Sequence, residues 1–87
     1  MRYLLAIFKS RNETLYFANL LKTNGIYSVI INTPKEAGQT CGISVKYCLR
    51  DHSKARMLYQ SKPFKSFYGF YIITEEGFGR KSIERYS

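Results

Sequence analysis

The chain has 87 residues, of which 45% are apolar, and a formal net charge of +8 from 14 basic and six acidic residues. Its longest apolar runs are far shorter than the roughly 20 residues of a membrane-spanning helix, and its first residues lack the pattern of a secretory signal. We therefore expect a single domain over residues 1–87, no membrane partner, a cytoplasmic location and a partner that carries negative charge.

The first half of the chain alternates between strand and helix patterns. Residues 2–8 are nearly all apolar and predict a central strand. Ser10 and Glu13 have capping-box spacing, so we expect a helix that begins at residue 10 or 12 and ends at Asn24-Gly25. Residues 26–31 are rich in β-branched side chains and predict a second strand, which ends before Pro34.

The second half repeats this alternation. Residues 42–47 predict a strand with one buried face, because Ile43, Val45 and Tyr47 alternate with more polar residues. Asp51 or Ser53 can cap a helix that ends before residue 63, and residues 67–74 predict a fourth strand. The order βαββαβ predicts an α+β, ferredoxin-like fold, in which a four-stranded antiparallel sheet carries two helices on one face. We expect the folded core to span residues 2–74 and residues 75–87 to form a charged C-terminal tail.

This topology gathers basic residues at one end of the predicted sheet. The first strand ends there and the first helix begins there, and the loop between the second and third strands and the exit of the second helix lie at the same end. Five basic residues and the free N–H groups of the first helix would then stabilise an anion or a thiolate: Lys9, Arg11, Lys35, Lys62 and Lys65.

Cys41 lies in the loop at that end, directly before Gly42. The thiolate is the nucleophilic form of cysteine, and nearby cations can lower a thiol pKa from about 8.5 to between about 3.5 and 7.5. Gly42 lacks a Cβ, so it permits unusual backbone angles and leaves the sulfur accessible. We therefore expect Cys41 to be the reactive thiol and Gly42 its backbone partner. The other interpretation is that the Cys-Gly pair only begins a strand, with Cys41 on the same face as Ile43 and Val45.

The segment Thr33-Pro34, followed by TCGISVKY at residues 40–47, resembles the signature of a family of small bacterial selenium/sulfur carrier-like proteins. The resemblance covers about residues 2–74, and the Cys-Gly pair is its most distinctive element. It implies that Cys41 holds a persulfide or perselenide, that Gly42 lies beside it, and that donor and acceptor proteins are the partners. Cys48 has no place in the motif; it is either a resolving thiol between two chains or a strand residue without a function.

Two other functions remain open. A sheet with an open face can stack nucleobases on aromatic side chains, and the positive charge favours an RNA or single-stranded DNA partner. Against this, the aromatic residues Phe67, Tyr68, Phe70 and Tyr71 lie on the fourth strand, and Ser44 and Lys46 on the third offer no ring. The second function is that of an assembly module. Residues 2–8 and 67–74 are apolar on both faces, while helices cover only one face of the predicted sheet. A second copy in a homodimer would cover the other.

The sequence gives little support for metal, disulfide or hydrolytic chemistry. Cys41 and Cys48 bound one predicted strand and would lie about 23 Å apart, against at most about 7 Å between the Cα atoms of a disulfide. No CxxC pair occurs, and His52, the sole histidine, falls at the opposite end from Cys41, where we expect a solvated first-turn residue. With no cofactor motif present, we expect a carrier or binding protein rather than a stand-alone enzyme.

Overall fold

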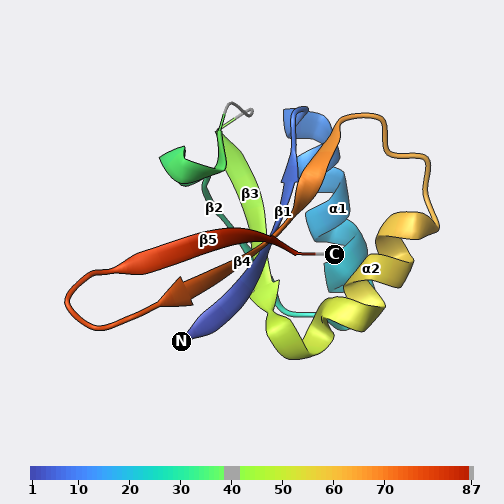
Figure 1. The fold of residues 1–87 in the computed structure, drawn as a ribbon. Helices are drawn as coiled ribbons and strands as arrows, with labels where there is room; N and C mark the ends of the chain where they lie inside the picture. Colours follow the sequence, from blue (N-terminus) through green and yellow to red (C-terminus); the bar gives the residue numbers. More distant parts are fainter. Residues whose placement is uncertain (39–41, 87) are drawn as a thin grey trace.

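The computed structural model describes residues 1–38 and 42–86. Its strands form one antiparallel sheet in the order β2-β3-β1-β4-β5, and two α-helices pack on one face of that sheet (Figure 1). The elements in chain order are β1 (Arg2–Phe8), α1 (Arg11–Thr23), β2 (Ser28–Asn32), η1 (Lys35–Ala37), β3 (Ile43–Cys48), η2 (Leu49–Asp51), α2 (His52–Gln60), β4 (Phe67–Glu75) and β5 (Lys81–Tyr86). Within the described residues, neither α-helix has the length and apolar character that crossing a membrane requires.

The predicted four-stranded ferredoxin-like sheet is wrong, because the sheet has a fifth strand. β5 forms in the stretch that we expected to be a charged tail, and it pairs antiparallel with β4 from Phe70↔Tyr86 to Glu75↔Lys81. The chain reverses through Phe78 and Gly79, both of which have positive φ. The backbone groups of β4 therefore find partners on two sides instead of facing water on one.

β1 lies at the centre of the sheet because it is apolar on both faces. Leu4, Ala6 and Phe8 face the helices, where they pack with Phe17 and Leu21 of α1. All five of these side chains have no exposed surface, as expected for a small core that must exclude water to be stable.

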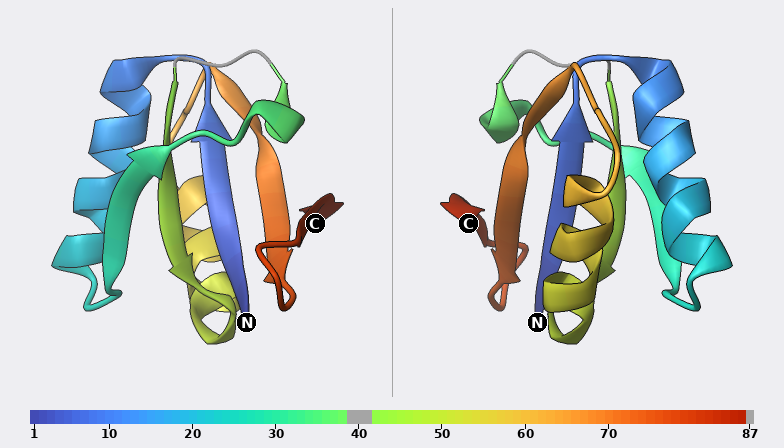
Figure 2. Two further views of the ribbon diagram at one scale, coloured as in Figure 1. Left: turned by 90° about the vertical axis from the view of Figure 1, so that its left-hand side faces the viewer. Right: turned by 90° about the vertical axis from the view of Figure 1, so that its right-hand side faces the viewer.

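The second face of the sheet is also covered, in this case by the chain itself. Tyr3, Leu5 and Ile7 are at most 6% exposed. Ala37 of η1 and Ile73 complete this smaller cluster, and the half-buried side chains that pack against it are Ile31, Tyr68, Tyr71 and Ile83. Figure 2 shows η1 on the opposite side of the sheet from α2. The open apolar face on which the nucleic-acid and homodimer alternatives rested is therefore largely closed.

The ends of α1 form as predicted. Ser10 is the N-cap, and its Oγ accepts a hydrogen bond from the backbone N–H of Glu13. Asn24 is the C-cap, and Gly25 follows with a φ of 79°, which glycine adopts at little cost. The start of α1 is thereby fixed beside the end of β1.

Candidate functional site

Cys41 lies outside the described residues, and Gly38 and Gly42 are the described residues nearest to it in the chain. The backbone N–H of Thr33 donates a hydrogen bond of 2.9 Å to the Gly42 carbonyl oxygen. Ser44 pairs with Ile7, which places the start of β3 beside the end of β1. Gly42 therefore lies at the end of the sheet where β1 ends and α1 begins.

Gly38 and Gly42 share a positive φ, and Gly38 is also crowded by a neighbouring side chain. Gly42 is exposed and has a φ of +96°, a region that L-residues with side chains rarely adopt, but a Cβ there would meet no atom within 4 Å. Gly38 has a φ of +93°, and a Cβ there would lie 2.8 Å from the hydroxyl oxygen of Tyr68. The backbone conformation requires glycine at both positions, and a close contact also requires it at Gly38.

Three of the five predicted cations come together around the N-terminus of α1. The backbone N–H of Lys9 donates to the carbonyl oxygen of Ser66 at 2.8 Å, which joins the end of β1 to the segment before β4. Arg11 is the first residue of α1, and Lys65 is held against the first turn of that helix through its backbone N–H. All three side chains are exposed, so their effect on a neighbouring anion is screened by salt.

The structure does not join the other two cations to this group. Lys35 lies in η1 and Lys62 follows the end of α2, and both are exposed. η1 and the end of α2 lie on opposite sides of the molecule in Figure 1. The described residues thus provide a group of three cations, Lys9, Arg11 and Lys65, while Lys35 and Lys62 lie on two separate segments.

Lys9, Arg11 and Lys65 form what we call the cationic corner, and Glu13 lies among them. From the sequence we expected Glu13 only to take part in helix capping. Its carboxylate accepts hydrogen bonds from the backbone N–H groups of Lys65 and Ser66 and from Ser66 Oγ at 2.6 Å. Burial alone would raise the pKa of the Glu13 carboxyl, but these hydrogen bonds and the Lys65 charge outweigh it and lower the pKa. A negative charge therefore lies among the three cations and offsets part of their field.

Tyr68 lies between Lys9 and Gly38, the glycine that precedes residues 39–41. Lys9 Nζ lies 5.9 Å from the centroid of the Tyr68 ring, within the range of a cation–π contact. The ring of Tyr68 stacks on that of Tyr71 with centroids 6.0 Å apart, and its hydroxyl faces Gly38. The half-buried ring thus lies against Lys9 on one side, and its hydroxyl occupies the space that a side chain at residue 38 would need.

Cys48 lies at the other end of β3, six residues from Gly42 or about 20 Å along a strand. It is an exposed free thiol. A cavity of about 260 Å³ beside it is lined in part by Tyr3, Tyr27 and Lys46. Cys48 is therefore remote from the end of β1 that the cations occupy.

The expectation that His52 is solvated is wrong. The side chain is 8% exposed, and its Nδ1 lies 2.8 Å from the hydroxyl oxygen of Tyr47. The rings of Phe70 and Tyr86 contact His52 with centroids 4.8 and 5.0 Å away. Burial raises the pKa of Tyr47, so that residue stays protonated. His52 is thus part of the core at the end of the sheet opposite Gly42.

The described residues contain no group of three histidine, cysteine, aspartate or glutamate side chains that could hold a metal ion. The charged and polar groups of the described residues at this end of the sheet are therefore cations, hydroxyls and the carboxylates of Glu13 and Glu36. These groups can attract an anion and orient it, but they do not make a general acid–base pair.

The fold and the site define a small basic α+β protein in which a Cys-Gly pair precedes a strand beside a cationic corner. The chain belongs to the family described as "Putative Se/S carrier protein-like", whose model matches residues 3–68. That range runs from β1 to the start of β4 and includes Cys41 and Gly42, but it leaves out β5. No curated protein and no solved structure matches the chain.

Proposed function

We propose that this protein carries sulfur or selenium as a persulfide or perselenide on Cys41. The observation that carries the proposal is the family match over residues 3–68, which contains the Cys41-Gly42 pair. The proposed partners are one protein that donates the atom and another that receives it. A cytoplasmic location belongs to the proposal, because thiols stay reduced there.

The transfer needs no oxidant or reductant beyond the donor. The Cys41 thiolate attacks the terminal sulfur of a donor persulfide, R–S–SH. A bond forms between Sγ and that sulfur, the S–S bond of the donor breaks, and R–S⁻ leaves with the electron pair. The product, Cys41–S–SH, passes its terminal sulfur to a nucleophile of the acceptor by the same exchange and returns to the thiolate.

The cationic corner supports this chemistry electrostatically. Lys9, Arg11 and Lys65 surround the first turn of α1, whose free N–H groups carry partial positive charge. Lys35 of η1 and Lys62, which follows α2, add further positive charge. Glu13 reduces the field, so we expect the pKa of the Cys41 thiol to be lowered modestly.

Persulfide loading tests the proposal directly. The protein is incubated with a low-molecular-weight persulfide, and its intact mass is then measured for the wild type, Cys41→Ser and Cys48→Ser. We expect the wild type and Cys48→Ser to gain one sulfur atom and Cys41→Ser to gain none. Equal loading of the two single variants, or no loading of the wild type, would remove Cys41 from this role.

A second candidate, self-association, is favoured by the edge strand β2. Residues 28–32, SVIIN, carry no charge, and Ile30 is 40% exposed and Tyr27 75% exposed beside them. Uncharged apolar edge strands are templates for pairing with another chain. Light scattering at high concentration tests this candidate: we expect a dimer that Ile30→Lys converts to a monomer, and a wild type that is monomeric throughout would exclude it.

A further inference from the structure

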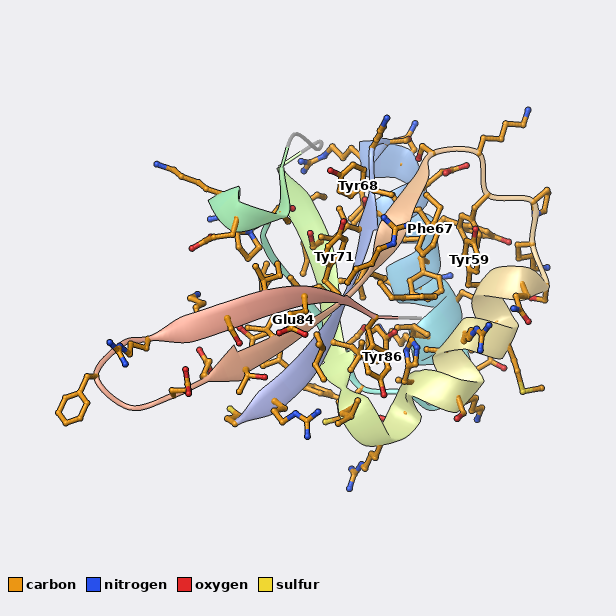
Figure 3. All side chains as sticks on the ribbon, viewed as in Figure 1. Tyr59, Phe67, Tyr68, Tyr71, Glu84 and Tyr86 are labelled. Atoms are coloured by element: carbon orange, nitrogen blue, oxygen red, sulfur yellow. The ribbon has the colours of Figure 1, made fainter. Side chains whose placement is uncertain are left out.

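The two edge strands of the sheet differ in charge. β5, at one edge, carries Lys81, Glu84 and Arg85 among its six residues (Figure 3). Charged side chains of this kind keep an edge strand from pairing with another chain. β2, at the other edge, reads SVIIN, and residues 23–34 around it form the longest stretch of the sequence without a charged side chain. Because the protein has a net charge of +8, a second copy meets least repulsion there.

One hydrogen bond shows which backbone groups of β2 face outward. The N–H of Thr33 donates to the carbonyl oxygen of Gly42, and these two residues continue the register in which Asn32 lies opposite Ile43. Hydrogen-bonded and non-hydrogen-bonded pairs alternate along an antiparallel ladder. Thr33 therefore points its backbone groups at β3, as does every second residue before it. The residues between them point their N–H and C=O groups away from β3: Ser28, Ile30 and Asn32.

These outward groups are symmetric about Ile30. A second copy of β2 can therefore pair with them antiparallel across a two-fold axis, with Ile30 opposite Ile30 of the second copy and Ser28 opposite its Asn32. All three outward residues then exchange hydrogen bonds. A shift of two residues in either direction leaves one of them opposite a residue outside β2. A contact that uses the same patch on both copies gives a closed dimer.

The side chains match on both faces in this register. Ile30 pairs with the buried Val45, so it lies on the helix face of the sheet, yet it is 40% exposed. A hollow of about 450 Å³ between α1 and β2 lies beside it, next to the position that Ile30 of the second copy takes. On the other face, Val29 lies opposite Ile31 of the second copy, and both are half-buried. Apolar side chains thus meet apolar ones, and the pairing removes more of their surface from water.

The same register would bring Tyr27 to the candidate site of the other copy. Tyr27 directly precedes β2, is 75% exposed, and falls opposite Thr33 of the second copy. Thr33 bonds to Gly42 through its backbone, and its hydroxyl oxygen lies 2.5 Å from that of Ser44. These bonds join the two ends of the segment that contains Cys41 in the sequence. The ring of Tyr27 would therefore lie at the base of that segment in the second copy.

We propose that a second copy of this chain pairs with β2 across a two-fold axis at Ile30, and that Tyr27 of each copy borders the Cys41 segment of the other. The inference rests on the self-association that β2 favours, to which it adds the register and a residue shared between the copies. It does not rest on persulfide chemistry, because every contact that carries it lies in β2 and its flanks. The two sheets join into one, with α1 of both copies on the same face.

Disulfide formation between single cysteines tests the register. Ser28→Cys and Asn32→Cys are each made in a chain that also carries Cys41→Ser and Cys48→Ser, and the two proteins are mixed and oxidised with diamide. Opposite residues of the proposed pair have Cα atoms about 5.5 Å apart, within the range of a disulfide. We expect the mixture to form the mixed disulfide dimer, identified by its mass. Either protein alone should form little disulfide, because its two cysteines then lie more than about 13 Å apart. No crosslinking, or equal crosslinking of the mixture and of each protein alone, overturns the proposal.

A pair of tyrosine substitutions tests the contribution of Tyr27. Sedimentation equilibrium measures the Kd of the dimer for the wild type, Tyr27→Ala and Tyr16→Ala. Tyr16 is the matched control, because it is 47% exposed on α1 and its ring lies beside Phe64, away from β2. We expect Tyr27→Ala to weaken the dimer by about five- to tenfold and Tyr16→Ala by less than about twofold, since aromatic side chains are frequent anchors of interfaces. Equal Kd values for the two variants overturn the contact of Tyr27 with the second copy.

The alkylation rate of Cys41 tests whether Tyr27 borders its segment. We expect this rate in the wild type to fall as the protein concentration rises and the dimer forms. Ile30→Lys should lose the dependence on concentration, whereas Met57→Lys, which adds the same charge at a residue 68% exposed on α2, should retain it. A dimer that forms the mixed disulfide but alkylates at a constant rate overturns the contact with the Cys41 segment. That result leaves persulfide loading of Cys41 unaffected, and failure of loading leaves the crosslinking result unaffected.

Discussion

The carboxylate of Glu13 and the hydroxyl of Ser66 are joined by a hydrogen bond of 2.6 Å between residues 53 positions apart in the chain. The same carboxylate oxygen accepts the backbone N–H of Ser66 at 2.8 Å. Ser66 Oγ in turn accepts the backbone N–H of Ser10, the N-cap of α1. The segment between α2 and β4 is thus attached to the first turn of α1, and the cations Lys9 and Lys65 are brought together by this attachment.

The first prediction concerns the charge of Glu13. Glu13→Gln should lower the free energy of unfolding by about 1 kcal/mol at pH 7, because hydrogen bonds to a charged acceptor are stronger than those to a neutral one. The folded state lowers the pKa of this carboxyl. Its contribution is therefore complete above the unfolded pKa of about 4.3 and is lost as the pH falls through the folded value. Urea unfolding of the two proteins at a series of pH values from neutral to acidic measures the effect.

Glu84→Gln is the control for this series, because Glu84 is exposed on β5. Its effect on the free energy of unfolding should stay within about 0.5 kcal/mol at every pH. A Glu13→Gln effect that persists at a pH below 3 would mean that the side chain acts by packing and not through its charge.

The second prediction concerns Gly38. Its φ of 93° and ψ of −162° lie in a region that is essentially restricted to glycine, and a Cβ would lie 2.8 Å from Tyr68 Oη. Gly38→Ala should therefore destabilise the protein by about 1 to 3 kcal/mol. Gly77→Ala is the matched control, since a Cβ at Gly77 meets no atom within 4 Å, and it should change stability by less than about 0.5 kcal/mol. Equal urea midpoints for the two variants would show that neither the angle nor the contact at Gly38 matters.

The four strands and two α-helices of residues 2–74 could be predicted because their signals are local. Apolar runs, β-branched residues and the Ser10 cap mark β1 to β4 and the two helices within a few residues. β5 could not be found in the same way, because four of its six residues, Lys81, Ser82, Glu84 and Arg85, are polar. It forms because the turn at Phe78 and Gly79 aligns it with β4 and because Ile83 and Tyr86 pack on opposite faces of the sheet. These contacts are tertiary and leave little trace in composition.

The third prediction follows from the position of Ile83. This side chain is half-buried against the cluster of Tyr3, Leu5 and Ile7. Ile83→Ala should lower the free energy of unfolding by about 1 to 2 kcal/mol, less than for a fully buried isoleucine, because part of the side chain already faces water. Ser82→Ala, at an exposed position in the same strand, is the control and should be nearly neutral. An equally small effect at Ile83 would mean that β5 contributes little to the stability of the sheet.

The candidate site could be predicted only in part from the sequence. Lys9, Arg11 and Lys65 could be grouped because topology alone places the end of β1 at the start of α1. The role of Glu13 could not, since a capping-box spacing predicts a bond to the backbone of Ser10, whereas its carboxylate accepts from Lys65 and Ser66. The burial of His52 could not be predicted either, because it also depends on a contact outside the helix. Its partner, Tyr47, comes from β3 and not from the helix that His52 begins.

The fourth prediction concerns this Tyr47–His52 pair. Tyr47→Phe removes the hydroxyl that lies 2.8 Å from His52 Nδ1 in a buried environment, and should cost about 1 to 2 kcal/mol in the free energy of unfolding. Burial raises the pKa of Tyr47, so wild-type stability should also fall as the pH rises above the unfolded value of about 10. Tyr27→Phe, at a residue 75% exposed, is the control and should unfold like the wild type. A neutral Tyr47→Phe would show that the hydroxyl contributes nothing to the core.

The fifth prediction concerns the reactivity of the two cysteines. If the corner of Lys9, Arg11 and Lys65 acts on Cys41, its thiol should be alkylated with a pKa below the ordinary value of about 8.5. Cys48, an exposed thiol at the other end of β3, is the comparison within the same chain. Lys9→Gln with Lys65→Gln should raise the pKa of Cys41 towards that value. The double variant Lys22→Gln with Lys81→Gln removes the same amount of charge elsewhere on the protein. It should leave the pKa of Cys41 unchanged, because exposed charges more than about 10 Å from a thiol are screened at 0.1 M salt. The pH dependence of alkylation at each cysteine, resolved by mass spectrometry, measures all of these values.

An ordinary pKa at Cys41 in the wild type would mean that the cations do not act on this thiol. Equal shifts of the Cys41 pKa in the two double variants would mean that only the net charge of the protein acts on it.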